Sequence, residues 1–289
     1  RGVATGTFVN RNHYAGYLVM CLSVGIGLLL AQLSTQQVYS WKDRLRGLLQ
    51  LLLSPKIRLR LYLAVMVVAL VLTRARMGNI AFFSALGVAG VVAVATGQRF
   101  SWRVVVFLIS LLVVDLFILG QWFGLDRLVE RLESTQPLQE ARVFSNAYVF
   151  DYLRDFPLTG SGGGSFYGVF PNYQPSDLPG FYLHAHNDYL EFAVELGIPA
   201  TLLLSVFVGL ALWSAWRVQR DRQTRLYRGA AFAVIMTVVW AAIHSSTDFS
   251  LQMPANALTF VTILAMAFVS RGLRGHVTNR RAANAVFSR

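Results

Sequence analysis

Long apolar runs alternate with short polar segments along most of the chain, and they set the expected architecture. The runs cover residues 14–33, 59–73, 79–96, 104–123, 189–216, 229–246 and 255–270. A helix needs about 20 apolar residues to cross the hydrocarbon core of a bilayer. The second run is short and needs its flanks, whereas the fifth is long and should tilt or project from the bilayer. The pattern predicts an all-α, polytopic helical membrane protein with seven transmembrane helices.

The distribution of Lys and Arg gives the expected orientation. Most of the 26 basic residues lie in the segments 34–58, 97–103 and 217–228 and in the tail after residue 270. Loops on the cytoplasmic side of a membrane carry such an excess. We therefore expect transmembrane spans over 1–123 and 189–270, one large external loop over 124–188, and a basic cytoplasmic tail over 271–289.

Composition narrows the class of protein. Hydrophobic residues make up 55% of the chain and charged residues 14%, which excludes both an ordinary soluble domain and a disordered chain. The single cysteine excludes a disulfide scaffold. A net charge of +12 would also suit a nucleic-acid-binding protein. Because the basic residues follow the membrane topology, we expect the lipid bilayer as a partner and no nucleic acid.

The external loop contains two segments with apolar residues at helical spacing, 126–134 and 139–156, and Pro157 closes the second. A glycine-rich stretch at 160–165 is either a hinge or a loop whose backbone amides cradle an anion. Aromatic residues follow, and they either pack on the bilayer surface or stack on sugar rings. They are Phe166, Tyr167, Phe170, Tyr173, Phe181 and Tyr182.

The loop ends in a polar cluster where the fifth apolar run begins. Asn187 or Asp188 suits the N-cap of the next helix, and Glu191 completes a pattern similar to a capping box. His184 and His186 are not explained by capping. For this histidine pair, a hydrogen-bonded structural role and a catalytic role both fit.

Arginines on the predicted outer side are unexpected, because basic residues are normally enriched in cytoplasmic loops, so each of them indicates a specific role. Arg74 and Arg76 follow the second run, Arg142 lies in the external loop, and Arg11 precedes the first run. Arg74 and Arg76 either snorkel to the interface or form an anion clamp that Arg142 could join. Guanidinium groups suit a clamp because they donate bidentate hydrogen bonds to phosphate.

Further ionisable residues lie in or near the later runs. Asp115 is inside the fourth run, where a charge is costly and indicates function. His244 and Asp248 are four residues apart at the outer end of the sixth run, which would put them on one helical face pointing at the same surface as His186. A structural polar pair and a functional site fit them equally well. The sequence contains no Asp-x-Asp signature, and we expect neither a metal nor a cofactor.

A histidine base and an arginine clamp at the outer interface favour one reaction class, which is transfer of a sugar from a lipid-linked diphosphate. The base takes a proton from an acceptor hydroxyl, and the arginines stabilise the charge that develops on the leaving diphosphate. A transporter of lipid-linked sugars is a weaker alternative, because inverted repeats are not seen in the sequence. A non-catalytic scaffold would not need external arginines and histidines.

Four stretches carry a resemblance to a known family. They are residues 6–16, residues 72–78, residues 142–197 and residues 244–256. The third is the most specific, with Pro-Leu-Thr-Gly-Ser-Gly at 157–162 and His-Ala-His-Asn-Asp-Tyr-Leu-Glu at 184–191. On these residues the chain resembles the O-antigen ligase and O-antigen polymerase family of bacterial inner-membrane proteins, which includes O-oligosaccharyltransferases. Family members usually have more spans, so the resemblance implies that N-terminal spans are missing.

The resemblance implies a GT-C-like fold and metal-independent, inverting glycosyl transfer at the periplasmic face. The donor would be a glycan on undecaprenyl diphosphate, and the acceptor would be lipid A–core, another glycan or a protein hydroxyl. Carried onto this sequence, Arg74 or Arg76 and Arg142 would bind the diphosphate, and His186, with His184 beside it, would be the catalytic group. Where the family has a Ser-Arg pair, this chain reads Thr-Arg-Ala-Arg at 73–76, so either arginine can align with it. Residues expected to support the site are Asn187, Asp188, Glu191, His244, Asp248 and Arg11.

Overall fold

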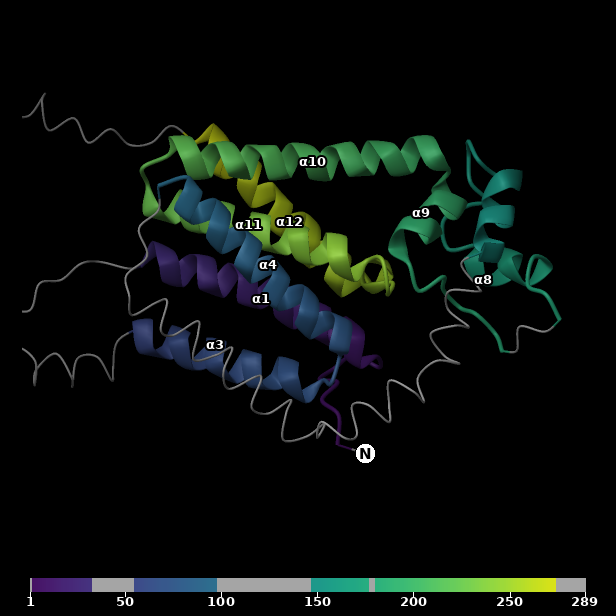
Figure 1. Ribbon diagram of the computed structural model, residues 1–289, viewed down its shortest axis with the longest axis horizontal. Helices are drawn as coiled ribbons and strands as arrows, with labels where there is room; N and C mark the ends of the chain where they lie inside the picture. The colour runs from purple at the N-terminus through teal and green to yellow at the C-terminus, as the bar shows by residue number, and fades with distance from the viewer. Residues whose placement is uncertain (1, 33–54, 98–146, 177–179, 274–289) are drawn as a thin grey trace, which may run out of the picture.

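All regular secondary structure is helical in the part of the chain that the structure describes. The structure is a computed structural model, and it describes residues 2–32, 55–97, 147–176 and 180–273 (Figure 1). The predicted fourth span, Asp115, Arg142 and the predicted helix at 126–134 lie outside the described residues.

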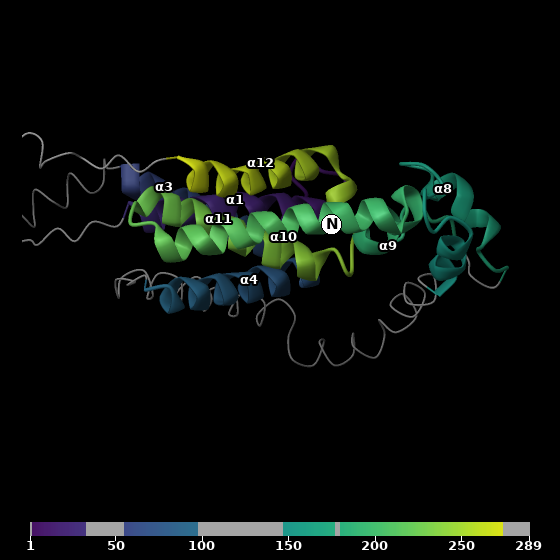
Figure 2. The same ribbon diagram turned by 90° about the horizontal axis from the view of Figure 1, so that it is seen from above.

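The α-helices of the described part form a bundle with a smaller group of short helices at one end (Figures 1 and 2). Residues 147–155 are also helical, and this helix ends before Pro157, as predicted. Two 3₁₀ turns cover Phe170–Asn172 and Ser250–Gln252. The α-helices are α1 (Arg11–Ala31), α3 (Pro55–Leu72), α4 (Arg76–Ala95), α8 (Phe166–Val169), α9 (Asp188–Leu196), α10 (Ile198–Asp221), α11 (Arg225–His244) and α12 (Pro254–Gly272).

Five described helices, α1, α4, α10, α11 and α12, are long and apolar enough to cross a membrane. The helix α3 matches the short second run, but Arg58 and Arg60 lie near its start and it is not among the five. The predicted all-α polytopic membrane architecture is confirmed. The count of seven spans stays a prediction, since the fourth run lies outside the described residues.

The fifth apolar run, 189–216, is two helices and not the single long span that was predicted. The helix α9 ends at Leu196 and α10 begins at Ile198, and Gly197 lies between them with a φ of 81°. A β-carbon at position 197 would lie 2.2 Å from the carbonyl oxygen of Leu158. Only glycine fits this conformation and this approach. Because hydrophobicity continues across the break, the apolar pattern does not reveal it.

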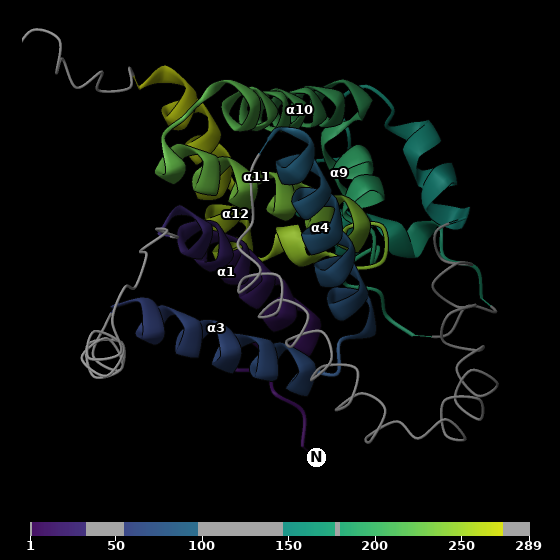
Figure 3. The same ribbon diagram turned by 60° about the vertical axis from the view of Figure 1, so that its left-hand side comes forward.

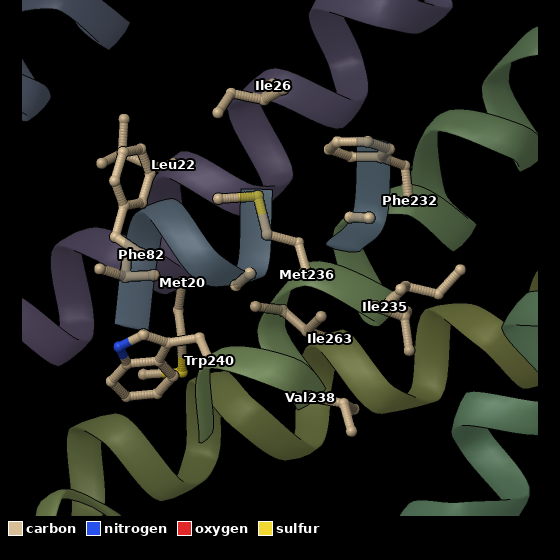
Figure 4. Packing of buried hydrophobic residues seen from close by; sticks show 14 of the residues in the cluster. Met20, Leu22, Ile26, Phe82, Phe232, Ile235, Met236, Val238, Trp240 and Ile263 are labelled. Carbon is tan, nitrogen blue, oxygen red and sulfur yellow. The ribbon is translucent and has the colours of Figure 1, made fainter. Parts of the chain in front are cut away.

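The helix α11 is the centre of the bundle. The helices α1, α4, α10 and α12 all pack against it, and α3 packs on α1 on the side away from α10 (Figures 1 and 3). Large side chains from α1 and α11 fill the interior, among them Met20, Leu22, Phe232, Met236 and Trp240 (Figure 4). The start of α1 lies next to the end of α11, where a β-carbon on Gly16 would lie 3.0 Å from the Trp240 ring.

The helices α1 and α11 approach each other closely at two glycines. A β-carbon on Gly27 would lie 2.2 Å from the carbonyl oxygen of Gly229, and one on Gly229 would lie 2.2 Å from the carbonyl oxygen of Gly27. Small residues allow such backbone contact between membrane helices, where association depends on van der Waals packing and interhelical hydrogen bonds and not on hydrophobic burial.

We expect Gly229→Ala to lower the stability of the folded protein by about 1–3 kcal/mol, since the added methyl group forces two backbones apart. Gly87→Ala on α4 is the matched control, because a β-carbon at position 87 meets no atom within 4 Å. The measurement is the thermal unfolding midpoint in detergent. Equal midpoints for the two variants would contradict the close helix contact.

A second, smaller core lies beyond the end of the bundle. It consists of Val149, Tyr152, Phe166, Phe170, Ala185 and Val194. The rings of Phe166 and Phe170 stack with their centroids 4.8 Å apart, and those of Tyr152 and Tyr173 stack at 5.0 Å. The expectation that this aromatic run packs on the bilayer or on sugars is wrong for Phe166 and Phe170, because they are buried in this core. Tyr167 and Phe181 are exposed.

The glycine-rich stretch at 160–165 closes the end of α9. The backbone amides of Ser161 and Gly162 donate to the carbonyls of Val194 and Glu195, at 3.0 and 2.9 Å. These amides therefore satisfy carbonyl groups that the last turn of a helix leaves without intrahelical donors. Because the amides of Ser161 and Gly162 are bonded to the end of α9, the predictions of a hinge and of an anion cradle are both wrong for these two residues.

Candidate functional site

Three segments that are far apart in the sequence meet at the end of the bundle next to the small core. They are the start of α1, the segment before α9, and the turn from α11 to α12. Each has a local reason for its shape: Asn10 caps α1 by accepting from the amide of Asn12, and Asn187 caps α9 by accepting from the amides of Tyr189 and Leu190. Together they assemble what we call the histidine cluster, which consists of His13, His184, His186 and His244 with Asp248 and Phe249.

The Asp248 carboxylate is the centre of this cluster. Its Oδ2 atom accepts from the Asn12 side chain, and its Oδ1 atom accepts from the amide of Phe249 at 2.8 Å. The same Oδ1 atom lies 3.6 Å from Nε2 of His13 and 4.0 Å from Nδ1 of His186. One carboxylate thus faces two histidines that are far apart in the sequence.

The contacts of Asp248 keep it ionised. Burial by itself would raise the pKa of Asp248, but His13, the nearby His244 and the donors Phe249 and Asn12 outweigh burial and lower the pKa to about 2. A permanent negative charge in a buried position stabilises a proton on a neighbouring imidazole.

The Phe249 ring joins three of the histidines. His184 stacks on it with ring centroids 4.0 Å apart, and His13 and His186 meet it edge-on at 4.6 and 4.9 Å. A flat apolar surface between three imidazoles fixes their ring planes and excludes water from between them.

His184 is held by a second buried carboxylate. Its Nδ1 atom lies 2.6 Å from Oε1 of Glu191, whose other oxygen accepts from the amide of Ala185 at 2.8 Å. Burial alone would lower the pKa of His184, but the hydrogen bond and charge of Glu191 outweigh it and raise the pKa. The predicted cap at Asn187 is confirmed, whereas the capping-box role of Glu191 is wrong, since its carboxylate bonds to the histidine segment.

Asp188 ties the start of α9 to the end of α11. Its Oδ2 atom accepts from the hydroxyl of Ser245 at 2.8 Å and from the amide of Leu251 at 3.2 Å, and its own amide donates to the Ser245 carbonyl. Burial raises the pKa of Asp188 to about 7 despite these bonds. The two buried aspartates therefore titrate far apart, with Asp248 ionised and Asp188 near its midpoint at neutral pH.

We expect the stability of the protein to fall by roughly 1.4 kcal/mol between about pH 6 and pH 8 through Asp188 alone. A folded-state pKa above the unfolded value of about 3.9 means that the folded protein binds this proton more tightly, so the stabilisation is lost as pH rises. Asp188→Asn should remove this dependence of stability on pH, because an amide does not titrate in this range. The fold should be kept, since the amide oxygen can still accept both hydrogen bonds. Unfolding midpoints at the two pH values measure it.

The control for this pH test is Asp151→Asn, which changes an exposed carboxylate paired with Arg154. This variant should show the same dependence of stability on pH as the wild-type protein. His184 contributes in the same direction in every variant, because its raised pKa also favours the folded state at lower pH. A slope that Asp188→Asn leaves unchanged would contradict the titration of Asp188.

The predicted pairing of His244 and Asp248 on one helical face is wrong in its geometry. The helix α11 ends at His244, and a turn through residues 245–247 carries the chain to Asp248. His244 is buried, stacks on Trp240 and lies 3.3 Å from the Ser250 hydroxyl. The two residues nevertheless interact electrostatically, because the turn folds back toward the helix end.

The turn between α3 and α4 brings the predicted arginines to the same end of the bundle. Thr73 shapes it, because its hydroxyl bonds to the carbonyl of Leu70 and accepts from the amide of Ala75. Beside it, a β-carbon on Gly78 would lie 4.0 Å from Nε2 of His244. Arg74 is half-buried and Arg76 is exposed at the first position of α4. Arg11 is exposed at the first position of α1.

Backbone strain marks two residues of this region. Within the described ranges, the non-glycine residues with positive φ are Arg74, at 53°, and His186, at 51°. Residues other than glycine rarely adopt this conformation, which costs roughly 1–3 kcal/mol and is found most often at functional sites. From the sequence, Arg74 was one of two alternatives for the diphosphate clamp, with Arg76, and His186 was the catalytic group that the family resemblance implies.

The sequence did not single out His13, Asn12 or Phe249, which the structure brings into the cluster. The available signal was the Asn-Arg-Asn-His stretch at residues 10–13, which belongs to a family-like segment. Among the described residues, no three His, Cys, Asp or Glu side chains are placed to hold a metal ion.

The fold and this site define a polytopic, all-α membrane protein with histidines and buried carboxylates gathered at one end of its bundle. The O-antigen ligase family model matches residues 61–205, just over half of the chain. The chain belongs to this family, whose members are glycosyltransferase-type enzymes. The match includes Arg74, His184 and His186, whereas His13 and Asp248 lie outside it. No curated protein matches the chain.

Proposed function

We propose that the chain transfers a glycan from undecaprenyl diphosphate to an acceptor hydroxyl, by a metal-independent and inverting reaction. One observation carries the proposal: strained backbone coincides with the residues that this chemistry needs, a histidine and an arginine, in a member of the O-antigen ligase family. Strain of this kind persists only where the surrounding structure holds it in place.

In the proposed reaction His186 is the general base. Its Nδ1 atom faces the Asp248 carboxylate, which favours a proton on Nδ1 and leaves Nε2 as the basic nitrogen. The acceptor hydroxyl gives its proton to Nε2 while its oxygen bonds to the anomeric carbon. The bond from that carbon to the diphosphate oxygen breaks, and the diphosphate leaves with the electron pair. Asp248 then stabilises the imidazolium.

The roles of the other histidines follow from their partners. His184 is anchored by Glu191 and stacks on Phe249, so we assign it to positioning the loop and contributing positive charge beside the base. His13 shares Asp248 with His186 and orients the carboxylate. Side chains of His184 and His186 are each 28% exposed, against 5% for His13, which leaves the first two accessible to a substrate.

The proposed diphosphate site is the turn at Arg74. Arg74 is the better candidate of the two sequence-selected arginines there, because it is half-buried and held in the left-handed conformation, whereas Arg76 is exposed. A half-buried guanidinium stabilises a developing anion more strongly than an exposed one, since water screens it less. Arg142 remains part of the proposed clamp on sequence grounds.

We further propose that the histidine cluster faces the periplasm and that the C-terminus is cytoplasmic. The arginines near the opposite ends of α10 and α12, Arg217, Arg220, Arg222 and Arg271, support this orientation under the positive-inside rule. In this arrangement 124–188 is the periplasmic loop and 271–289 the cytoplasmic tail of an inner-membrane protein with a GT-C-like fold.

Complementation tests the proposal and selects the acceptor. The chain is expressed in one host that lacks its O-antigen ligase and in another that lacks its O-antigen polymerase, and surface glycan is separated by electrophoresis. Restored glycan on lipid A–core in the first host identifies a ligase, and restored long chains in the second identify a polymerase. Glycan on protein in either host identifies an O-oligosaccharyltransferase. No new glycan in either host, despite membrane expression, would contradict the proposal.

A further inference from the structure

A hollow lies between the last turns of α10 and α12. These turns are at the opposite end of the bundle from α9 (Figure 1). Its volume is about 360 Å³, and it is lined by Arg217, Val218, Asp221, Arg222 and Arg271. Three guanidinium groups therefore surround one small cavity on a membrane protein. Neither the proposed reaction nor its substrates use this end of the molecule.

The positive charge of the hollow is only partly neutralised. Asp221 is the one carboxylate among its lining residues, and it is shared between Arg217 at 2.9 Å and Arg220 at 2.8 Å. Arg222 donates to the backbone carbonyl of Arg271, and Arg271 donates to the Ser214 hydroxyl at 3.3 Å. Among the described residues these two arginines bond to neutral oxygens, so an anion entering the hollow would meet positive charge that these bonds do not neutralise.

Two tryptophans place the hollow at the membrane surface. Arg271 and Arg217 lie over the Trp213 ring, at 4.2 and 5.6 Å, and Arg220 lies over Trp216 at 4.6 Å. Both indoles are partly exposed, and tryptophan is enriched where hydrocarbon meets headgroups. Next to Trp213 along α10, the exposed side chains of Leu210 and Phe207 offer an apolar surface that an acyl chain can follow.

We propose that this hollow binds the phosphate of an anionic glycerophospholipid, with the acyl chains lying along α10. The phosphodiester would accept hydrogen bonds from Arg217, Arg222 and Arg271, which suits guanidinium geometry. A lipid is favoured over free phosphate, because the charged hollow continues into the apolar surface of α10. Basic pockets between transmembrane helices on the cytoplasmic side are known to hold such headgroups. This site does not depend on the proposed transferase activity, but its place on the cytoplasmic side rests on the orientation proposed above.

Native mass spectrometry of the purified chain with phosphatidylglycerol or phosphatidylcholine tests the proposal. We expect retention of phosphatidylglycerol and at least about tenfold weaker binding in the Arg217→Gln/Arg222→Gln double variant. The control is Arg220→Gln, which removes one positive charge from the same helix end, against two in the double variant, and lies outside the hollow. It should bind phosphatidylglycerol within about twofold of wild type. Arg271→Gln repeats the test from α12 if the double variant does not fold.

Three results would overturn the lipid site. The first is equal binding of the two lipids. The second is an equal loss of phosphatidylglycerol in Arg220→Gln and the double variant, which would mean diffuse surface attraction. The third is displacement of phosphatidylglycerol by inorganic phosphate at low millimolar concentration, because the hollow would then be a site for the free anion.

Discussion

His186→Ala is expected to abolish detectable glycan transfer while the protein stays folded in the membrane. Removing a general base costs about 10²–10⁴-fold in rate, enough to erase glycan from a complementation gel. The described histidines offer no substitute, because His184 is bound to Glu191 and His13 and His244 are buried. The measurement is surface glycan in the complemented host together with the amount of protein in the membrane.

The alanine change also alters a residue with positive φ, so a second variant separates chemistry from backbone effects. Asn tolerates the left-handed conformation better than most residues, and His186→Asn therefore keeps the loop but lacks a basic nitrogen. It should be as inactive as His186→Ala. Substantial transfer by a well-expressed His186→Asn would remove the base role. If His186→Ala does not fold but His186→Asn folds and is inactive, the role of His186 as general base is still supported.

Arg74→Lys is expected to lower transfer by about 10²-fold or more, which is the usual cost of losing one donor that stabilises developing charge. Lysine keeps the positive charge but replaces a planar fork with a single ammonium group. The loss should appear in the turnover number more than in donor binding, since charge on the diphosphate develops as the glycosidic bond breaks. An assay with purified protein and a lipid-linked donor separates the two.

The same turn supplies the control for this prediction. Arg76→Lys makes the identical chemical change two residues away, at an exposed position. It should retain most of the activity and the same unfolding midpoint. If Arg76→Lys is the inactive variant and Arg74→Lys is active, the assignment of the clamp within residues 73–76 is reversed, and the strained φ of Arg74 then has a purely structural cause.

The predictable part of the molecule was what depends on local pattern. Apolar runs located four of the five helices that can cross a membrane, because a span needs a continuous apolar length, but they merged the fifth, α10, with α9. The cap at Asn187 followed from its position before an apolar run. His184, His186 and Arg74 stood out because polar residues at the ends of apolar runs need an explanation, and the structure brings their segments to one end of the bundle.

The unpredictable part depends on contacts between distant segments. The Asn12 side chain bonds to Asp248 across 236 positions of sequence, and no local pattern signals such a pair. The break at Gly197 also has a distant cause, which is the approach of Leu158. Glu191 fitted a helix-capping pattern but bonds to His184, because a partly exposed imidazole offered a stronger partner than a helix end already capped by Asn187.

The interlock of Gly160 and Gly197 sets a rule for exchanging parts among related proteins. A β-carbon on Gly160 would lie 2.2 Å from the carbonyl oxygen of Glu195, and the amide of Ile198 donates to the carbonyl of Pro157 at 2.9 Å. The two segments thus fit closely against each other, because each has a glycine where the backbone of the other comes too near for a side chain. In a recombinant that takes residues 157–162 from one parent and 194–198 from another, the two segments have not been selected to pack against each other. Useful crossover points therefore lie outside residues 157–198.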